Sequence, residues 1–456
     1  MKQFSLILVM LGLLITACNE QKPAENNTKP VAKNTKLQHP DWTKHANIYE
    51  VNIRQYTPEG TFKAFDNHLD RLNKMGVDIL WLMPVYPIGE KNRKGGLGSY
   101  YSIKDYSAVN PEFGNMSDLK ALIDHAHSLG MHVILDWVAN HTAWDHPWIN
   151  EHPEWYKVDS AGNIVSPFDW SDVAALNYDN PQLRKAMIGE MKYWLNNANI
   201  DGFRCDVAMM VPTDFWDSAR AELDKIKPVF MLAEAEVPEL NKKAFDMSYG
   251  WEMHHKIAQV AQGKEAASVL NEQVKKDLER FGSDTYLMQF TTNHDENSWN
   301  GTEYEKMGDG AEIMAVFTYV TPGMPLIYSG QEAANKKRLA FFEKDMLNWE
   351  FIPLQGFYQN LIRLKNENKA LWNGNFGGSY LALKNGMEDK VVTFLRQKEN
   401  NKVIFIGNMS AEPVKVNVDI NDASGEYVNW FTNEKVKLGK AMEFELKPRQ
   451  YYVFVK

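Results

Sequence analysis

Cysteine is nearly absent from the sequence. The 456 residues include two cysteines, Cys18 and Cys205, and the second lies inside an apolar stretch that is typical of a buried strand. Disulfide-rich folds need several cysteines at regular spacings, so the sequence excludes a disulfide framework. A chain of this length can instead bury a large apolar core and form more than one domain.

The N-terminus lacks an apolar run long enough to span a bilayer. Its apolar residues 4–17 follow a lysine and are fewer than the ~20 that a membrane-spanning helix needs. A short apolar segment behind a basic residue is typical of a signal peptide. We therefore predict that residues 1–17 are a signal peptide.

This segment ends in LITAC, in which small residues precede Cys18 as in the lipobox of bacterial lipoproteins. Cleavage before Cys18 and lipidation of its thiol would anchor the protein to a membrane of the cell envelope, facing the periplasm or the cell surface. An ordinary secretory signal is the alternative. Residues 18–40 are polar and rich in Pro, Asn and Lys, so we expect a flexible, lipidated tether.

Positive charge is not in excess. The sequence has 50 basic and 59 acidic residues, which gives a net charge of −9. Proteins that bind nucleic acid usually carry a basic patch, so we expect no nucleic-acid partner. A glycine-rich phosphate loop is also missing, and a neutral substrate is the simpler expectation.

Short apolar runs alternate with amphipathic helical patterns through most of the sequence. This alternation over residues 41–138 and 181–373 predicts a parallel (β/α)8 TIM barrel, with an open doubly wound sheet as the alternative. Residues 139–180 are irregular and predict a small domain inserted after the third strand. Residues 374–456 contain alternating runs without a helix and predict a C-terminal antiparallel β-sandwich domain.

Four polar clusters follow predicted barrel strands, where active sites of such barrels lie. Three of their carboxylates, Asp206, Glu234 and Asp295, are candidates for chemistry. Glycoside cleavage needs one protonated carboxyl to donate to the leaving oxygen and one carboxylate to attack the sugar. The clusters are DWVANHT (136–142), GFRCDVA (202–208), LAEAE (232–236) and TTNHDEN (291–297).

The second cluster places a charge pair on one face of a strand. Because strand side chains alternate, Arg204 and Asp206 should point one way and Phe203, Cys205 and Val207 the other. A structural ion pair is one interpretation. The other is that the arginine holds a carboxylate ionised for catalysis.

The four clusters, in this order, resemble the signature regions of the α-amylase family, glycoside hydrolase family 13. The resemblance extends from about Trp42 to the C-terminus. It implies retaining cleavage of α-glucosidic bonds and matches residues 139–180 and 374–456 with the family's domains B and C. No cofactor is implied beyond the calcium ion of some members.

The resemblance also assigns roles to the three carboxylates. It makes Asp206 the nucleophile, Glu234 the general acid/base and Asp295 a ligand of the sugar hydroxyls. We expect Arg204 to lower the pKa of Asp206. Glu234 has no cation beside it in the sequence, so burial should favour its protonated form, and Glu236 is the rival acid.

Other residues match positions around the cleaved bond. The resemblance implies that His141, His294 and Tyr101 contact the sugar. We predict that Arg204 also belongs to the substrate-binding residues. Asp136 and Asn140 match residues that support the site. A zinc site made of Asp136 and the two histidines is the alternative, but the short ligand spacing of a zinc motif is missing.

The sequence departs from the best-known members of the family. Met209 and Met210 stand where those members have a Lys-His pair, and Ala175 replaces an aspartate that helps bind calcium. We therefore expect no metal site. Val207 resembles the valine of members that cleave α-1,6 bonds, but it is equally explained as a packed strand residue.

The leading hypothesis is a retaining α-glucan hydrolase that cleaves α-1,4 bonds of starch- or glycogen-derived glucans and oligosaccharides, with α-1,6 bonds left open. A glycosyltransferase of the same family is one alternative. A catalytically silent glucan-binding lipoprotein is another, although the presence of all three carboxylates argues against it.

Overall fold

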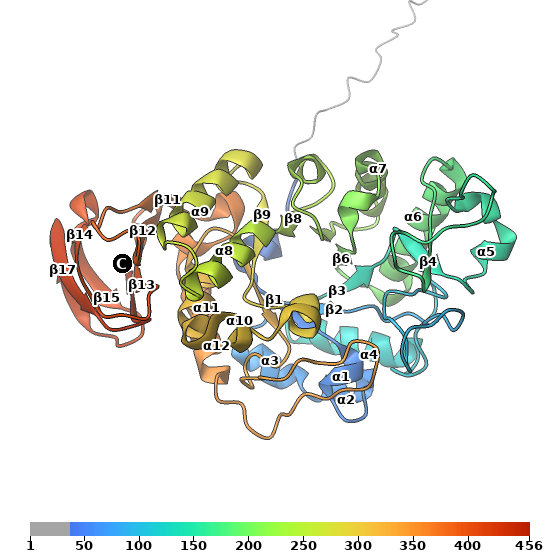
Figure 1. Ribbon diagram of the computed structural model, residues 1–456, viewed down its shortest axis with the longest axis horizontal. Coiled ribbons are helices and arrows are strands. Elements are labelled where there is room, and N and C mark those ends of the chain that lie inside the picture. The colour runs from blue at the N-terminus through green and yellow to red at the C-terminus, as the bar shows by residue number, and fades with distance from the viewer. Residues whose placement is uncertain (1–36) are drawn as a thin grey trace, which may run out of the picture. The chain divides into compact units, whose positions relative to one another are not determined.

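The computed structural model describes residues 37–456 (Figure 1). The predicted signal peptide, Cys18 and most of the predicted tether lie outside the described residues.

Eight parallel strands form a closed barrel, in the order β1-β10-β9-β8-β7-β6-β3-β2. The predicted (β/α)8 barrel is therefore confirmed. Its strands are β1 (Ile48–Val51), β2 (Ile79–Leu82), β3 (His132–Trp137), β6 (Gly202–Cys205), β7 (Phe230–Ala233), β8 (Met247–Tyr249), β9 (Tyr286–Gln289) and β10 (Met324–Tyr328).

Strand β8 is the barrel strand that the sequence patterns do not predict. It has three residues, too few for an alternating pattern to be visible. Its position is fixed instead by its neighbours, since Met247 pairs with Leu232 of β7 and with Tyr286 of β9.

Helices surround the barrel (Figure 1). Helix α6 begins at Pro181 because the Asn180 side chain accepts hydrogen bonds from two backbone N–H groups and Pro181 suits the first turn. Among residues 37–456, none of the helices has both the length and the apolar character needed to cross a bilayer. The helices are α1 (Ile53–Tyr56), α2 (Phe62–Asp66), α3 (Leu69–Met75), α4 (Met116–Ser128), α5 (Trp148–Glu151), α6 (Pro181–Ala198), α7 (Thr213–Leu223), α8 (Trp251–Ala261), α9 (Ser268–Phe281), α10 (Glu303–Met307), α11 (Ala311–Val320) and α12 (Gln355–Glu367).

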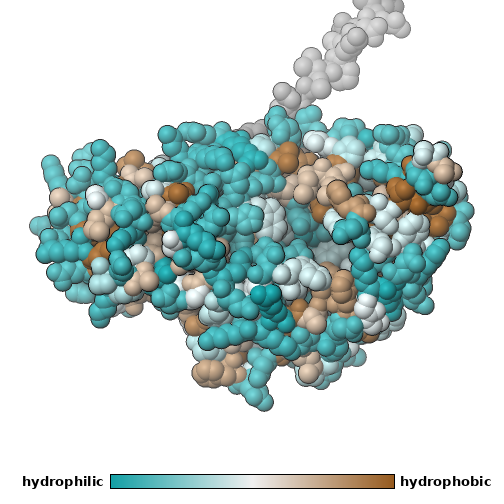
Figure 2. All heavy atoms as spheres, viewed as in Figure 1, coloured by the Kyte–Doolittle hydropathy of each residue, from teal (hydrophilic) through white to brown (hydrophobic). Residues whose placement is uncertain are grey.

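Side-chain alternation divides the barrel core into two layers. In β2, Ile79 and Trp81 belong to the apolar cluster inside the barrel, whereas Leu80 and Leu82 pack with the cluster between strands and helices. Phe203 and Cys205 belong to that outer cluster too, so the intervening Arg204 points inward, as the strand pattern predicts. The face seen in Figure 2 is mainly hydrophilic, with apolar residues in separate groups.

The segment after β3 forms a two-stranded antiparallel sheet of β4 (His141–Ala143) and β5 (Val173–Ala175). Next to it, the buried rings of Trp148 and Trp155 meet edge to face at 5.0 Å. Trp148 thus packs in the interior of this segment, whereas Trp170 lines a cavity that is described below.

The C-terminal residues form antiparallel sheets without an α-helix, as predicted. Residues from both sheets share a third apolar cluster, which includes Ile404, Val416 and Phe454. The larger sheet contains β11 (Ser379–Ala382), β12 (Val391–Lys398), β13 (Asn401–Asn408), β18 (Tyr451–Val455), β15 (Gly425–Asn429) and β16 (Lys435–Leu438), and the smaller one β14 (Val414–Asp419) and β17 (Ala441–Leu446).

Gly202, which begins β6, leaves no room for a side chain. A Cβ atom there would lie 1.9 Å from the backbone oxygen of Phe230, and φ is +156°. We predict that Gly202→Ala lowers the free energy of unfolding by more than ~3 kcal/mol, because strands β6 and β7 would have to separate. Chemical denaturation monitored by fluorescence measures the change.

The matched control is Gly189→Ala in α6, where an added Cβ meets nothing within 4 Å. This substitution should stabilise the protein by about 0.5–1 kcal/mol, because alanine favours a helix interior. Equal effects of the two substitutions would contradict this explanation.

Candidate active site

The four polar clusters meet at one cavity of about 560 Å³ at the carboxyl ends of the barrel strands. Five carboxylates and two histidines line the same space. The predicted residues among those that line it are Tyr101, His141, Asp206, Glu234, His294 and Asp295.

Arg204 connects carboxylates from three neighbouring strands. Its Nη1 donates hydrogen bonds to Asp136 at 2.9 Å and to Asp206 at 3.1 Å, and its Nη2 lies 2.9 Å from Oε2 of Glu234. The guanidinium is fully buried beneath the carboxylates and does not line the cavity. Arg204 is therefore placed to hold the carboxylates, rather than to contact a sugar.

The expectation that Glu234 has no cation beside it is wrong. Arg204 pairs in register with Leu232, two residues before Glu234, so its long side chain reaches across the strand boundary to Glu234. Sequence neighbours do not reveal a contact made between strands.

Arg204 acts to lower the pKa of Asp206, as expected, but the net shift is upward. Burial raises the pKa of Asp206 well above its usual value, the nearby Glu234 raises it further, and Arg204 opposes both.

Val207 does not continue the strand alternation. Strand β6 ends at Cys205, and Val207 has a left-handed backbone with φ of 37°. This turn brings Val207 to the same cavity as Asp206, and its backbone N–H donates to Glu234 at 2.7 Å. The prediction that it points to the opposite face is therefore wrong.

Glu236, the rival of Glu234, does not line the cavity. Its carboxylate accepts from the backbone N–H of Glu252 at the start of α8. Burial, together with Asp277 and Glu252, raises the Glu236 pKa to about 7. Because Glu236 lies outside the cavity, Glu234 is the better candidate for the acid of this site.

A chain of polar contacts runs from Glu50 to the cavity. His294 Nδ1 hydrogen-bonds to the buried Glu50, and its Nε2 lies 2.7 Å from the Tyr101 hydroxyl and 3.3 Å from Asp295. Burial lowers the His294 pKa, but Asp295 and Glu50 outweigh it and raise the value to about 9. The ring is therefore positively charged at neutral pH.

Glu50 was not predicted from the sequence. It stands in β1 within an apolar run, IYEV. A glutamate is rarely buried unless it has a partner, so a carboxylate inside an apolar strand is the sequence signal that could have indicated it. Asp136 has the supporting position expected of it, accepting hydrogen bonds from Trp81 at 3.1 Å and Tyr101 at 3.0 Å.

His141 lines the cavity as a neutral ring. Burial lowers its pKa to about 4. Its Nδ1 lies 3.2 Å from the Asn140 amide nitrogen, which can act there only as a donor, so Nε2 carries the proton. A neutral donor of this kind suits a sugar hydroxyl.

Aromatic rings of the cavity were also missed by sequence reasoning. Trp299 is 52% exposed, and its ring lies 5.2 Å from that of Phe341 and 5.8 Å from that of Phe342. Together with Trp170 these residues line the cavity. Exposed aromatic faces of this kind can stack on apolar faces of a ligand.

Comparison with known families agrees with this geometry. Residues 32–170 and 154–352 match the α-amylase catalytic domain, and residues 380–453 match the maltogenic amylase C-terminal domain. The chain belongs to the α-amylase family.

Individual α-amylases resemble the chain over most of its length. An α-amylase of Haloarcula japonica is 28% identical to this chain over 85% of its residues. The matched region covers 59% of the length of that relative. The crystal structure of a maltogenic α-amylase from Thermotoga neapolitana has a TM-score of 0.83 at 28% identity, covering 91% of this chain and 99% of that one. The crystal structure of a Lactobacillus plantarum α-amylase has a TM-score of 0.80 at 30% identity, with the same coverage.

The residues of this α-amylase family member do not fit the calcium site of its best-known relatives. Ala175 offers a methyl group, and the Asn140 amide contacts His141. Asp172, the buried carboxylate of this segment, is paired with Lys94 at 3.2 Å. In residues 37–456, no group of three or more His, Cys, Asp or Glu side chains could hold a metal ion.

We predict that excess chelator leaves both turnover and the melting temperature unchanged within about 1 °C, because no ligand of the folded state is removed. Differential scanning fluorimetry and an activity assay, each with and without added calcium, measure this. A melting temperature that falls on chelation and recovers with calcium would refute it.

The charged His294 depends on Glu50. We predict that Glu50→Gln lowers the His294 pKa below 9, as read from its ring proton resonances in an NMR titration. Because the folded pKa exceeds the ordinary value of about 6.5, the stability that this charge contributes is fully present below pH 6.5 and is lost toward pH 9. The stability difference between wild type and variant should shrink over this interval.

His146 is the internal control for this titration. Burial lowers its pKa to about 4, and its ring contacts Tyr106 and Trp148, away from Glu50. An unchanged His294 pKa in the variant would show that Glu50 does not hold the charge.

Proposed function

We propose that the chain hydrolyses α-glucosidic bonds of α-glucans and malto-oligosaccharides by a retaining double displacement. The observation that carries this proposal is the convergence of Asp206, Glu234 and Asp295 on one cavity, with Arg204 joining the first two from below. The names of the similar proteins, α-amylase and maltogenic α-amylase, support glucans as the substrate class.

The residues divide the reaction into two steps. Asp206 attacks the anomeric carbon while Glu234 donates a proton to the leaving oxygen, so the glycosidic bond breaks as an ester bond to Asp206 forms. Water then attacks the same carbon, Glu234 removes its proton, and Asp206 leaves as a carboxylate. Attack by a sugar hydroxyl in the second step would make the enzyme a transferase.

Arg204 acts through the carboxylates. The reaction needs one proton on the Asp206–Glu234 pair, and the shared guanidinium fixes both side chains while that proton moves. The backbone N–H of Val207 also donates to Glu234, which orients the acid toward the bond.

The remaining cavity residues would bind the sugar. His294⁺ and Asp295 offer a donor and an acceptor for hydroxyl groups, and Tyr101 stacks against His294 with ring centroids 5.5 Å apart. His141 adds a neutral donor. Trp299 and Phe341 would supply apolar surface for sugar rings farther from the cleaved bond.

The linkage that is cleaved is a further part of this proposal. We assign α-1,4 bonds as the main substrate and α-1,6 bonds as the alternative. Proteins similar to this chain include a cyclomaltodextrinase and an oligo-1,6-glucosidase. Product analysis on maltotriose, pullulan and isomaltose distinguishes the two linkages and reveals transfer products.

We further propose that the enzyme is a lipoprotein held at the cell envelope through Cys18. The LITAC sequence after the apolar run supports this proposal. A tether of about 20 residues would let the barrel reach soluble glucans at a distance on the order of 25 Å from the membrane.

Substitution of the two reactive carboxylates tests the mechanism. Asp206→Asn should reduce kcat by a factor on the order of 10³ or more with the fold retained, because the amide keeps the shape and is no nucleophile. Glu234→Gln should be as damaging on maltotriose but much milder on α-glucosyl fluoride, whose leaving group needs no proton.

Glu236→Gln is the matched control, since this nearby glutamate lies outside the cavity, and its rate should stay within about twofold of wild type. Substantial activity in Asp206→Asn, or equal losses of Glu234→Gln on both substrates, would reject the assigned roles.

The anchor is tested separately. Cys18→Ala should shift the protein from the membrane fraction to the soluble fraction or block its processing, because the thiol needed for lipidation is gone. Cell fractionation with a high-salt wash measures this. A variant that stays membrane-bound after the wash would exclude lipidation as the anchor.

A further inference from the structure

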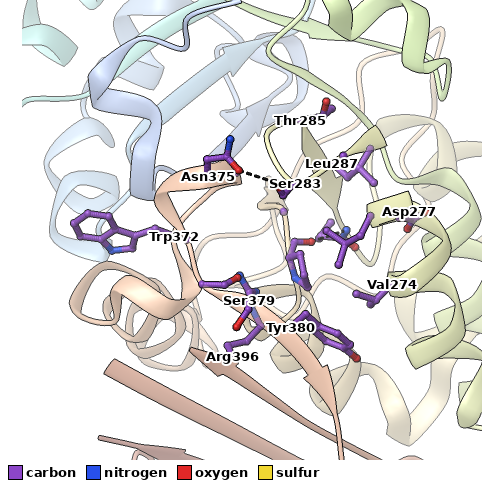
Figure 3. Close-up of a pocket in the computed structure, with 18 of the residues that line it drawn as sticks. Val274, Asp277, Ser283, Thr285, Leu287, Trp372, Asn375, Ser379, Tyr380 and Arg396 are labelled. Atoms are coloured by element: carbon purple, nitrogen blue, oxygen red, sulfur yellow. Dashed lines mark hydrogen bonds between the residues drawn. The ribbon is translucent and has the colours of Figure 1, made fainter. Parts of the chain in front are cut away.

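A second cavity, of about 450 Å³, lies between the barrel and the C-terminal sheet. Thr285 and Gly323 line it just before β9 and β10, so it is near the amino ends of these strands, opposite the catalytic cavity. Figure 3 shows Val274 and Asp277 of α9 on one side and Ser379 and Arg396 of the C-terminal sheet on the other.

Arg396 is a buried cation of this cavity without a carboxylate partner. Its side chain is 2% exposed, and among residues 37–456 no acidic group lies within ion-pair distance. Its Nη1 and Nη2 donate to the backbone oxygens of Val320 and Gly378, each at 3.2 Å. Its Nε–H has no acceptor in the described part of the chain.

Such an arrangement is costly for the protein alone. A buried charge is normally paired, and an unsatisfied donor on a charged group loses the hydrogen bond that water would have offered. Burial lowers the Arg396 pKa to about 10, so the group stays positively charged at neutral pH. The hydrogen bonds to two carbonyl oxygens give the Nη atoms a structural role, but they leave the Nε–H without an acceptor.

Further positive charge surrounds the same space. Lys398 lies two residues after Arg396 on β12, hence on the same face, and also lines the cavity. Asp277 is the acidic residue of the lining, and its Oδ1 accepts from Gln273.

The other lining groups suit a small polar molecule. Ser379 offers a hydroxyl on the side of Arg396, and Tyr380 offers aromatic surface (Figure 3). At Gly377 a Cβ atom would lie 2.0 Å from the backbone oxygen of Trp372, so the glycine permits a close approach of two backbone segments at the edge of the cavity. The volume exceeds what a single small ion fills.

We propose that this cavity binds a phosphate group, free or carried by a sugar, with Arg396 and Lys398 as its cationic contacts. Phosphate oxygens match the planar fork of a guanidinium and accept strong charge-assisted hydrogen bonds. A bound phosphate would supply, from the cavity, the negative charge that the Arg396 guanidinium lacks. It would also bridge the barrel and the C-terminal sheet, and thereby stabilise the folded chain.

Isothermal titration calorimetry with inorganic phosphate and, separately, with glucose 1-phosphate tests the proposal at constant ionic strength. We expect one site per chain for at least one of the two probes. Arg396→Gln and Lys398→Gln should each weaken binding at least about tenfold, the loss of one charge-assisted contact. The matched control, Lys402→Gln on the adjacent strand β13, should bind as wild type does.

The two probes separate the sources of the phosphate. Equal affinities would indicate a site for the free ion, and tighter binding of glucose 1-phosphate would indicate a sugar phosphate held also by the aromatic lining. Because glucose 1-phosphate could enter the catalytic cavity, its binding counts only if Lys398→Gln weakens it.

Lys398 is half-buried at the end of its strand, so its variant keeps the test valid if Arg396→Gln does not fold. Absence of binding for both probes, or binding that Lys398→Gln leaves unchanged, would overturn the proposal. The hydrolytic rate of Lys398→Gln without phosphate should equal that of wild type, since the catalytic cavity is at the other ends of the strands.

Discussion

The contact of the buried Arg204 guanidinium with Asp136, Asp206 and Glu234 is the interaction on which the site depends. Three strands each contribute one carboxylate, and a single cation holds them together at 2.9–3.1 Å. Removing one partner from a buried charge network typically costs 3–5 kcal/mol, because the remaining charges lose their compensation. The same contact that positions the reactive groups therefore also constrains the barrel.

Barrel closure supplies the register that this contact needs. Asp136 pairs directly with Arg204 across β3 and β6, and Arg204 pairs with Leu232 of β7. A shift of one residue would turn each side chain to the opposite face. Gly202 permits the close approach of β6 to β7, so the glycine at the start of GFRCDVA and the charged residues Arg204 and Asp206 that follow it depend on the same strand geometry.

Much of this arrangement could be predicted from the sequence, because barrel strands deliver the residues at their carboxyl ends to one place. The meeting of Asp206, Glu234, His294 and Asp295 in one cavity follows from that rule together with the family resemblance. The Arg204–Glu234 contact does not, since it depends on pairing between strands. Likewise the left-handed turn at Val207 interrupts an alternation that the letters alone would continue.

The net electrostatic effects in the site could not be predicted from the sequence either. A sequence shows that Arg204 is near Asp206 but not that burial and Glu234 outweigh it, so the direction of the Asp206 pKa shift required the structure. Glu50 shows the same limit, because its effect on His294 arises between residues 244 positions apart. Local patterns report which charges exist, whereas their balance depends on depth and on partners from distant strands.

The central claim is that Asp206 and Glu234 cleave α-glucosidic bonds in two displacements at one carbon. Proton NMR of the products released from maltotriose in the first minutes of reaction tests it most directly, since each displacement inverts the anomeric centre. The account predicts that the newly formed reducing end appears first as the α-anomer and only later equilibrates with the β-anomer. Initial formation of the β-anomer would show a single displacement and would contradict the account.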